Sequence, residues 1–246
     1  VFLWPKEFTL KAYQYVLESK EFWSSVSVSV KRVLLGVPLN TLLTILVAYP
    51  LSKDERQFKA RKYYVAYMLT VMLFNGGLMP TYYIVSKTKL IDTVWALIIP
   101  GAVPIFNCIV LMNFFRGIPS ELEESAKLDG ANDFVIFTRL YLPLSKAGLA
   151  TIGLFIALGY WNNWANAKLY INSSKLYPLQ YLLYQMFSNI QVLKDAAMQS
   201  GVAMVDLPAE TFRMAMAVVT TGPILLLYPF VQRYFVKGIT VGAVKG

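Results

Sequence analysis

The sequence contains no histidine, a single cysteine and few charged residues for its length. Of its 246 residues, none is histidine, one is cysteine and 15% are charged. Without histidine, the chain lacks the most common general base, the serine–histidine–aspartate triad and the usual zinc and haem ligand. Because Cys108 stands alone, no disulfide or cysteine metal cluster can form within the chain. An enzyme of another kind stays open, but the side chains that enzymes use most are missing.

Two further absences concern nucleotides and nucleic acids. No stretch matches GxxxxGK[ST], the loop whose backbone amides hold nucleotide phosphates, so ATP cannot bind to this chain by that route. The formal net charge is +9, but the basic residues stand between apolar runs rather than in one continuous stripe. We therefore expect no nucleic-acid partner, and no metal or cofactor bound by this chain.

The sequence is instead rich in long apolar segments. Hydrophobic residues make up 57% of the chain, more than a soluble domain can hide from water. A helix needs about 20 residues to cross about 30 Å of hydrocarbon. The pattern predicts an all-α, polytopic membrane helix bundle that forms a single transmembrane domain over residues 1–246. The five expected spans are 33–51, 63–83, 94–115, 148–169 and 212–235.

The distribution of lysine and arginine predicts how this bundle is oriented. Short cytoplasmic loops carry an excess of positive charge, and five such residues lie in the loop at 52–62. We therefore place 52–62, 116–146 and the C-terminus in the cytoplasm, and 170–211 outside. Lys31 and Arg32 precede the first span on its outer side, where we interpret them as solvated or snorkelling residues.

This orientation leaves the start of the chain outside the membrane. The first residues show no signal-peptide pattern that would carry them there. We therefore expect a further helix before Val1, which would give six spans in all.

The insert at 116–146 has the chemistry of two short helices joined by a sharp turn. Pro119 suits the first turn of a helix, and the acidic residues after it suit the positive end of the helix dipole. Gly130 suits a C-cap with positive φ. Asn132 can then cap a second helix, which Pro143 would end. Such a shape can fit as a knob into a groove of another protein.

The spacing within this insert resembles the EAA loop of ATP-binding-cassette importer permeases. That pattern is Glu-Ala-Ala, three residues, Gly, nine residues, Ile, one residue and Leu-Pro. Here Glu124-Ser125-Ala126 is followed at the same intervals by Gly130, Leu140 and Leu142-Pro143. The departures are conservative, serine for alanine and leucine for isoleucine. The resemblance implies that eight residues couple this chain to an ATPase. They are Glu124, Ser125, Ala126, Asp129, Gly130, Ala131, Leu140 and Pro143.

The resemblance covers nearly the whole chain and extends to the carbohydrate-uptake branch of these permeases. It implies a non-catalytic permease subunit of the bacterial plasma (inner) membrane that passes an oligosaccharide by alternating access. It also implies a second homologous permease subunit, two ATPase subunits that hold ATP and Mg, and an external solute-binding protein. The insert at 116–146 would then be a cytoplasmic coupling loop. The alternative is an interfacial helix without a partner, but such helices favour lysine and arginine on their polar face.

A polar, aromatic stretch near the outer end of the fourth expected span is our candidate substrate path. Asparagine in an apolar span is costly unless it is paired or faces a water-filled cavity, and aromatic faces can stack on sugar rings. On one helix, the two tryptophans would share one side and two of the asparagines another. The same residues also suit an interfacial aromatic belt or contacts between helices. The stretch consists of Trp161, Asn162, Asn163, Trp164 and Asn166.

Three basic residues at the predicted outer side bear on the charge of the substrate. Lys168, Lys175 and Arg213 could favour an anionic oligosaccharide such as a uronate chain, or they are ordinary solvated loop charges.

Two other classes of membrane protein are alternatives to the importer subunit. A secondary transporter without an ATPase partner needs internal repeats or intramembrane carboxylates, and the sequence shows neither. A membrane-embedded enzyme would have little to work with, since histidine and paired intramembrane acids are missing.

Overall fold

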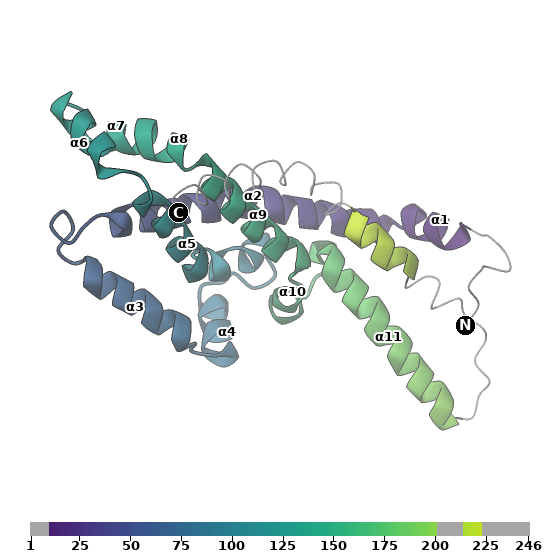
Figure 1. The fold of residues 1–246 in the computed structure, drawn as a ribbon. Coiled ribbons are helices and arrows are strands. Elements are labelled where there is room, and N and C mark those ends of the chain that lie inside the picture. The colour runs from purple at the N-terminus through teal and green to yellow at the C-terminus, as the bar shows by residue number, and fades with distance from the viewer. Residues whose placement is uncertain (1–9, 201–213, 223–246) are drawn as a thin grey trace.

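The regular elements of this chain are helices. The computed structural model describes residues 10–200 and 214–222, and within them no strand occurs (Figure 1). The helices are α1 (Lys11–Glu18), α2 (Lys20–Ser52), α3 (Arg61–Leu73), α4 (Leu78–Lys87), η1 (Val94–Leu97), η2 (Ile99–Gly101), α5 (Ile105–Arg116), α6 (Ser120–Leu128), α7 (Asp133–Ile136), the π-helical η3 (Phe137–Tyr141), α8 (Leu142–Leu144), α9 (Lys146–Asn162), α10 (Ala165–Tyr170), η4 (Ser174–Leu176), α11 (Leu179–Ser200) and a stretch at 214–222.

Helix α2 is the axis around which the described part of the bundle is organised. Its 33 residues make it about 50 Å long, more than the hydrocarbon layer requires. The helix begins well before the expected span because Ser19 caps it, accepting a hydrogen bond from the Phe22 amide at 3.3 Å. Helices α5 and α9 pack along it (Figure 1). The buried core between these three helices includes Ala48, Leu51, Leu111, Phe115, Ile152 and Ile156.

Only one described helix, α2, is long and apolar enough to cross a membrane by itself. Three other pairs could each form one broken span: α3 with α4, bent by 110°, η1–η2 with α5, bent by 53°, and α7–α8 with α9, bent by 75°. The expected span at 63–83 is therefore not one straight helix. Gly77 has a φ of 88° and donates its amide hydrogen to the Asn75 side chain at 2.8 Å, which breaks the helix there.

The fifth expected span, 212–235, lies outside the described residues except for the helical stretch at 214–222. The C-terminal tail, whose charges predicted a cytoplasmic end, also lies outside them. The described residues thus contain one to four spans by length and composition, and the expected total of five remains a prediction.

Arg32 departs from its predicted environment. Only 1% of the residue is exposed, so it neither lies in solvent nor snorkels. Its Nε donates to the carbonyl oxygen of Leu97 at 3.2 Å, and its Nη1 donates to those of Tyr160 at 3.1 Å and Asn163 at 2.7 Å. The prediction was wrong because carbonyls at the C-terminal end of α9 and in η1 satisfy the charge inside the bundle. Its neighbour Lys31 is exposed, as expected.

A glycine brings α2 and α9 into close contact beside this arginine. A Cβ atom on Gly36 would lie 2.4 Å from Cε2 of Tyr160, so the ring occupies the space that any larger residue would need. The Tyr160 hydroxyl in turn donates to the carbonyl oxygen of Ile98 at 3.2 Å. Together with Arg32, these contacts join α2, α9 and the η1 segment.

Candidate functional site

Helix α6 ends in a tight turn that explains the spacing of the motif around Gly130. The Gly130 amide donates to the carbonyl of Lys127 at 3.0 Å, and the Ala131 amide donates to that of Ala126 at 2.9 Å. This pair of bonds is the Schellman arrangement, which requires a left-handed residue just after the helix. Gly130 supplies it with a φ of 82°. The interval between Ala126 and Gly130 is therefore dictated by backbone geometry, as the sequence predicted.

The second helix of the insert begins as predicted and ends later than predicted. The Asn132 side chain accepts a hydrogen bond from the Val135 amide at 2.9 Å and caps α7. The chain then stays helical through η3 and α8, so Pro143 does not end the helix. A π-helical turn directly precedes this proline. Its wider winding makes room for a ring that would clash with the carbonyl four residues back in a regular α-helix.

The eight motif residues divide between the surface and the core. Ala126, Ala131 and Leu140 are partly buried and pack against the main hydrophobic cluster. The rest face outward on the insert: Glu124, Ser125, Asp129, Gly130 and Pro143 are exposed. The inward residues hold the two helices on the bundle, and the outward residues form a surface.

Large apolar side chains of the insert are also exposed, and the motif did not point to them. Leu128 is 89% exposed and Phe134 is 71% exposed, and Leu122 is exposed as well. Apolar residues at otherwise polar positions of a loop outside the spans were the signal that could have found them. An exposed apolar patch rimmed by charge is typical of a protein interaction site.

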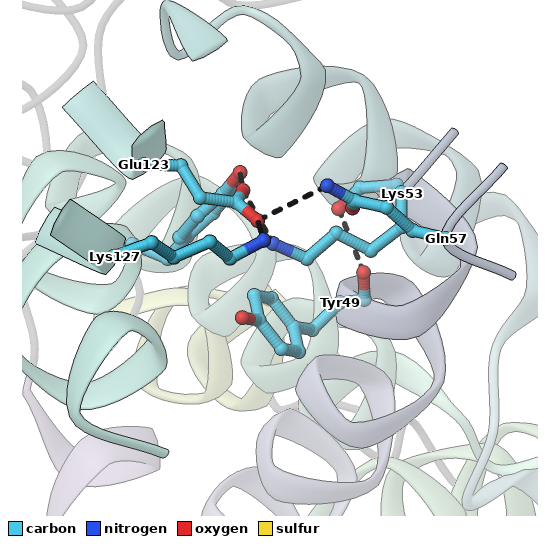
Figure 2. A network of polar contacts seen from close by, with 7 residues as sticks. Tyr49, Lys53, Gln57, Glu123 and Lys127 are labelled. Atoms are coloured by element: carbon cyan, nitrogen blue, oxygen red, sulfur yellow. Dashed lines mark hydrogen bonds and ion pairs between the residues drawn. The ribbon is translucent and has the colours of Figure 1, made fainter. Parts of the chain in front are cut away.

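Figure 2 shows that Glu123 is the centre of a polar network at the base of the insert. The residue is 5% exposed. Its Oε2 accepts from Lys53 Nζ at 2.6 Å and from the Tyr141 hydroxyl at 2.6 Å, and its Oε1 accepts from Lys127 Nζ at 2.7 Å. Gln57 Nε2 donates to Oε1 at 3.4 Å. Helix α6, the end of α2, the following loop and η3 meet at this one carboxylate.

The network fixes the charge of its members. Burial by itself raises the pKa of the Glu123 carboxyl, but hydrogen bonds from Lys127, Lys53 and Tyr141 outweigh it and lower that pKa to about 2. The bond to Glu123 raises the pKa of Lys127. Burial, and then the bond to Glu123, raises the pKa of Tyr141. At neutral pH the centre is therefore a carboxylate held by cationic and hydroxyl donors.

Aromatic rings surround the Lys53 ammonium group. Its Nζ lies 4.5 Å from the ring centroid of Tyr49 and 4.2 Å from that of Tyr141. The Tyr49 ring also lies 4.6 Å from the Phe137 ring, between centroids. The charge pattern predicted only that Lys53 lies in a cytoplasmic loop, and no pattern in the sequence singles out Glu123. Their contact spans 70 positions of the chain, so local patterns could not show it.

The candidate substrate path is not on one continuous helix. Helix α9 ends at Asn162 and α10 begins at Ala165, so the predicted sharing of helix faces was wrong. The Asn163 side chain causes part of this break, because it accepts a hydrogen bond from the Asn166 amide at 3.0 Å. Trp161 is buried, and its indole donates to the carbonyl of Thr220 at 3.2 Å.

The other tryptophan of this stretch is exposed and belongs to an aromatic cluster. The Trp164 and Tyr184 rings stack with centroids 4.1 Å apart and an angle of 10° between their planes. Lys168 Nζ donates to the Tyr184 hydroxyl at 3.0 Å. Asn162 is exposed nearby in sequence. Of the five candidate path residues, Trp164 thus combines an exposed ring with a neighbouring positive charge. Within the described residues, no group of acidic or cysteine side chains could hold a metal ion.

Comparison with known proteins places the chain in a family. Residues 17–241 match the family described as binding-protein-dependent transport system inner membrane component. The chain belongs to this family of membrane permease subunits. Protein LplC of Bacillus subtilis (strain 168) is 43% identical over 247 residues, which cover 100% of this chain and 82% of LplC.

The names of a second relative and of a similar solved structure mention a substrate. The polygalacturonan/rhamnogalacturonan transport system permease protein YtcP of Bacillus subtilis (strain 168) is 42% identical over 246 residues, covering 98% of this chain and 84% of YtcP. A chain of a bacterial ABC transporter involved in the import of the acidic polysaccharide alginate matches with a TM-score of 0.84. It is 31% identical, and the match covers 96% of this chain and 82% of that one. These matches confirm the predicted helical membrane fold and the resemblance to ATP-binding-cassette importer permeases.

Proposed function

We propose that this chain is a multi-pass permease subunit that passes an acidic oligosaccharide across the bacterial plasma membrane. It is the non-catalytic part of the importer, with its C-terminus and the 116–146 insert in the cytoplasm. The observation that carries the proposal is the insert, in which a glycine turn presents Glu124 and Leu128 on an exposed surface. Family membership supports the class of transporter, and the printed names of its relatives support the class of substrate.

The insert is the docking surface for an ATPase. Leu128 and Phe134 supply apolar area for a groove, and Glu124 supplies a carboxylate that can pair with a basic residue there. Two ATPase subunits hold ATP and Mg, and one of them receives this insert. A second homologous permease subunit completes the membrane part, and an external solute-binding protein delivers the sugar. Closure of the ATPases around ATP rocks the spans between inward-open and outward-open states as rigid bodies.

The substrate path runs by the outer stretch that contains Asn162, Trp164 and Asn166. The exposed Trp164 ring offers a face for a sugar, and Lys168 offers a positive charge for a carboxylate. Two similar proteins support an acidic sugar, since one is named for polygalacturonan and rhamnogalacturonan and the other imports alginate.

Copurification tests the docking surface. The chain is expressed with its importer partners, and the ATPase that copurifies is quantified. Glu124→Lys should reduce it because the carboxylate becomes a like charge for a basic groove, and Leu128→Asp should reduce it because the apolar contact is lost. Lys62→Gln is a matched control, since Lys62 is exposed outside the insert. If the ATPase is retained in full by both insert variants, the docking surface is misassigned.

Uptake into proteoliposomes tests the substrate. An oligogalacturonate should enter the reconstituted importer in the presence of ATP faster than its neutral methyl ester. Trp164→Ala with Lys168→Gln should lower uptake of the acid, whereas Lys87→Gln, a change at another exposed lysine, should not. Equal uptake of acid and ester would refute an acidic substrate. Uptake that continues without ATP would favour a secondary transporter instead.

A further inference from the structure

Glu123 makes the polar contacts that hold helix α6 to the rest of the described structure, and Ala126 adds an apolar contact with the main hydrophobic cluster. Glu123 is the only buried residue in the helix; its other side chains are exposed or partly buried. The chain enters α6 through Gly117 and Pro119 and leaves it through the Gly130 turn. A load applied to the exposed face of α6 therefore reaches the bundle through the Glu123 network, through the packing of Ala126, and through the chain on either side of the helix.

We propose that Glu123 is a positioning residue that transmits movement of α6 to α2 and, through η3 and α8, to α9. The inference rests on the proposed docking of the insert on an ATPase. It assigns a task to a residue that lies beside the motif and faces away from the docking surface. Docking and transmission would thus belong to adjacent glutamates, Glu124 outward and Glu123 inward.

The bonds of Glu123 lead directly into the membrane helices. Lys53 is the C-cap of α2, so its 2.6 Å bond ties α6 to the end of the longest described helix. Tyr141 is the last residue of η3, and the chain continues from it through α8 into α9. Both segments meet at Oε2 of the same carboxylate, which accepts from Lys53 and from Tyr141. Figure 2 shows the bond from Lys53. A displacement of α6 then moves both helices together instead of bending the insert alone.

We call Glu123 with its partners Lys53, Lys127 and Tyr141 the Glu123 joint, and the surroundings of this joint restrict its movement. Lys53 cannot leave easily because the rings of Tyr49 and Tyr141 flank its ammonium group. Lys127, one turn further along α6, holds the other carboxylate oxygen at 2.7 Å and limits rotation of the Glu123 side chain. Charge-assisted hydrogen bonds with several donors are stronger and more directional than a single neutral bond.

The test uses the complete importer in proteoliposomes, with Glu123→Gln and the control Glu121→Gln. Glu121 is an exposed glutamate in the first turn of the same helix. We expect Glu123→Gln to keep the ATPase bound and to lower sugar uptake per ATP hydrolysed by about tenfold, within the range typical of coupling between sites. Hydrolysis should also lose its response to the loaded solute-binding protein. The control should match the wild type in all three measurements.

Two further variants keep the inference testable if Glu123→Gln folds poorly. Tyr141→Phe removes only the hydroxyl that donates to Glu123, and should lower uptake per ATP by a smaller factor with the ATPase bound. Lys53→Met breaks the link to α2. If Lys53 and Glu123 act through one another, the double variant Lys53→Met with Glu123→Gln should be no more uncoupled than either single variant.

The outcomes separate this inference from the proposed function. If no ATPase copurifies with the wild type, the proposed function is wrong, whatever Glu123 does. If the ATPase binds and Glu123→Gln imports as much sugar per ATP hydrolysed as the wild type, the proposed role of Glu123 in transmission is refuted. Loss of the ATPase from Glu123→Gln would also refute it, since Glu123 would then serve docking. Additive effects of Lys53→Met and Glu123→Gln would refute the link to α2.

Discussion

Arg32, within α2, and Lys53, at its C-cap, hold a shielded positive charge in different ways. Arg32, toward the N-terminal end, donates to three backbone carbonyls and has no carboxylate partner within the described residues. Lys53, at the C-terminal end, pairs with the carboxylate of Glu123 at 2.6 Å. Both links connect segments far apart in the sequence. Only the second one has a carboxylate as its acceptor, which gains a proton in acid.

This difference indicates what each link is suited to do. Peptide carbonyls at the end of a helix are fixed dipoles that do not gain a proton in acid, and the Arg32 link cannot be rearranged without moving the backbone. The acceptor of the Lys53 link is a side-chain carboxylate, so this link can move with α6 and can be titrated by acid. The contacts of Arg32 form a permanent connection, and the contact between Lys53 and Glu123 forms a joint.

Removal of the Arg32 connection should cause the largest loss of folding stability. Arg32→Met removes the donor from two buried carbonyl groups and one half-buried one, and an unpaired buried group costs about 1–3 kcal/mol, so we expect a loss of stability on the order of 4 kcal/mol. The measurement is the thermal unfolding midpoint and the yield of folded protein in detergent. Lys31→Met, at the exposed neighbouring position, should change neither. A normal midpoint for Arg32→Met would show that the carbonyls find other donors.

Acid should weaken the joint and leave the permanent connection intact. The pKa of Glu123 is about 2 in the folded chain against an ordinary value of 4.5, so its bonds stabilise the fold fully above pH 4.5. This contribution, about 3 kcal/mol, is lost as the pH falls from 4.5 toward 2. Unfolding midpoints of the wild type and Glu123→Gln, measured between pH 2 and 7 (roughly the range over which carboxylates titrate), should converge at the acid end. A constant gap would contradict the titration of Glu123.

A substitution in the Gly130 turn beside the joint should lower the stability of the fold by a smaller amount. Gly130→Ala forces a β-carbon onto a backbone with a φ of 82°, and this should cost about 1 kcal/mol. No atom lies within 4 Å of the new Cβ position, so the cost comes from the backbone alone. Gly153→Ala is a control in a helix with equally open space. Equal midpoints for both variants would show that the turn bears no strain.

The smallest effect is expected at the exposed edge of the joint. The Lys127 side chain is 41% exposed, and its bond to Glu123 is a contact between residues four apart on one helix. Lys127→Met should therefore cost about 0.5 kcal/mol. Chemical denaturation, compared with Lys53→Met, provides the measurement. A larger loss for Lys127→Met than for Lys53→Met would reverse our ranking of the two lysines.

The local chemistry of the insert could be predicted from the sequence. Gly130 and Asn132 act through backbone groups within four residues of themselves, so their types and spacing contain the information. The apolar segments likewise predicted helices, because lipid leaves a backbone few other ways to satisfy its hydrogen bonds. The family resemblance followed from the same local pattern.

The long-range links could not be predicted. The environment of Arg32 depends on carbonyls 65, 128 and 131 positions away, and a carbonyl has no signature in the sequence. Glu123 stands beside another glutamate of the same helix, and only the position of α2 decides which one is buried. The break between Trp161 and Asn166 was missed because a local side-chain bond competes with a helix that the apolar pattern favoured.

The contacts of Arg32 also impose an order on synthesis. During translation, Arg32 enters the membrane 65 residues before its first acceptor and 128 residues before the acceptor at Tyr160. An unpaired arginine costs up to about 2.5–3.5 kcal/mol on insertion scales, the value for the centre of a membrane helix. Until α9 has been made, Arg32 lacks the acceptors at Tyr160 and Asn163 and must stay near water or inside the insertion machinery. The nascent chain therefore completes the Arg32 contacts only after Asn163 has been synthesised.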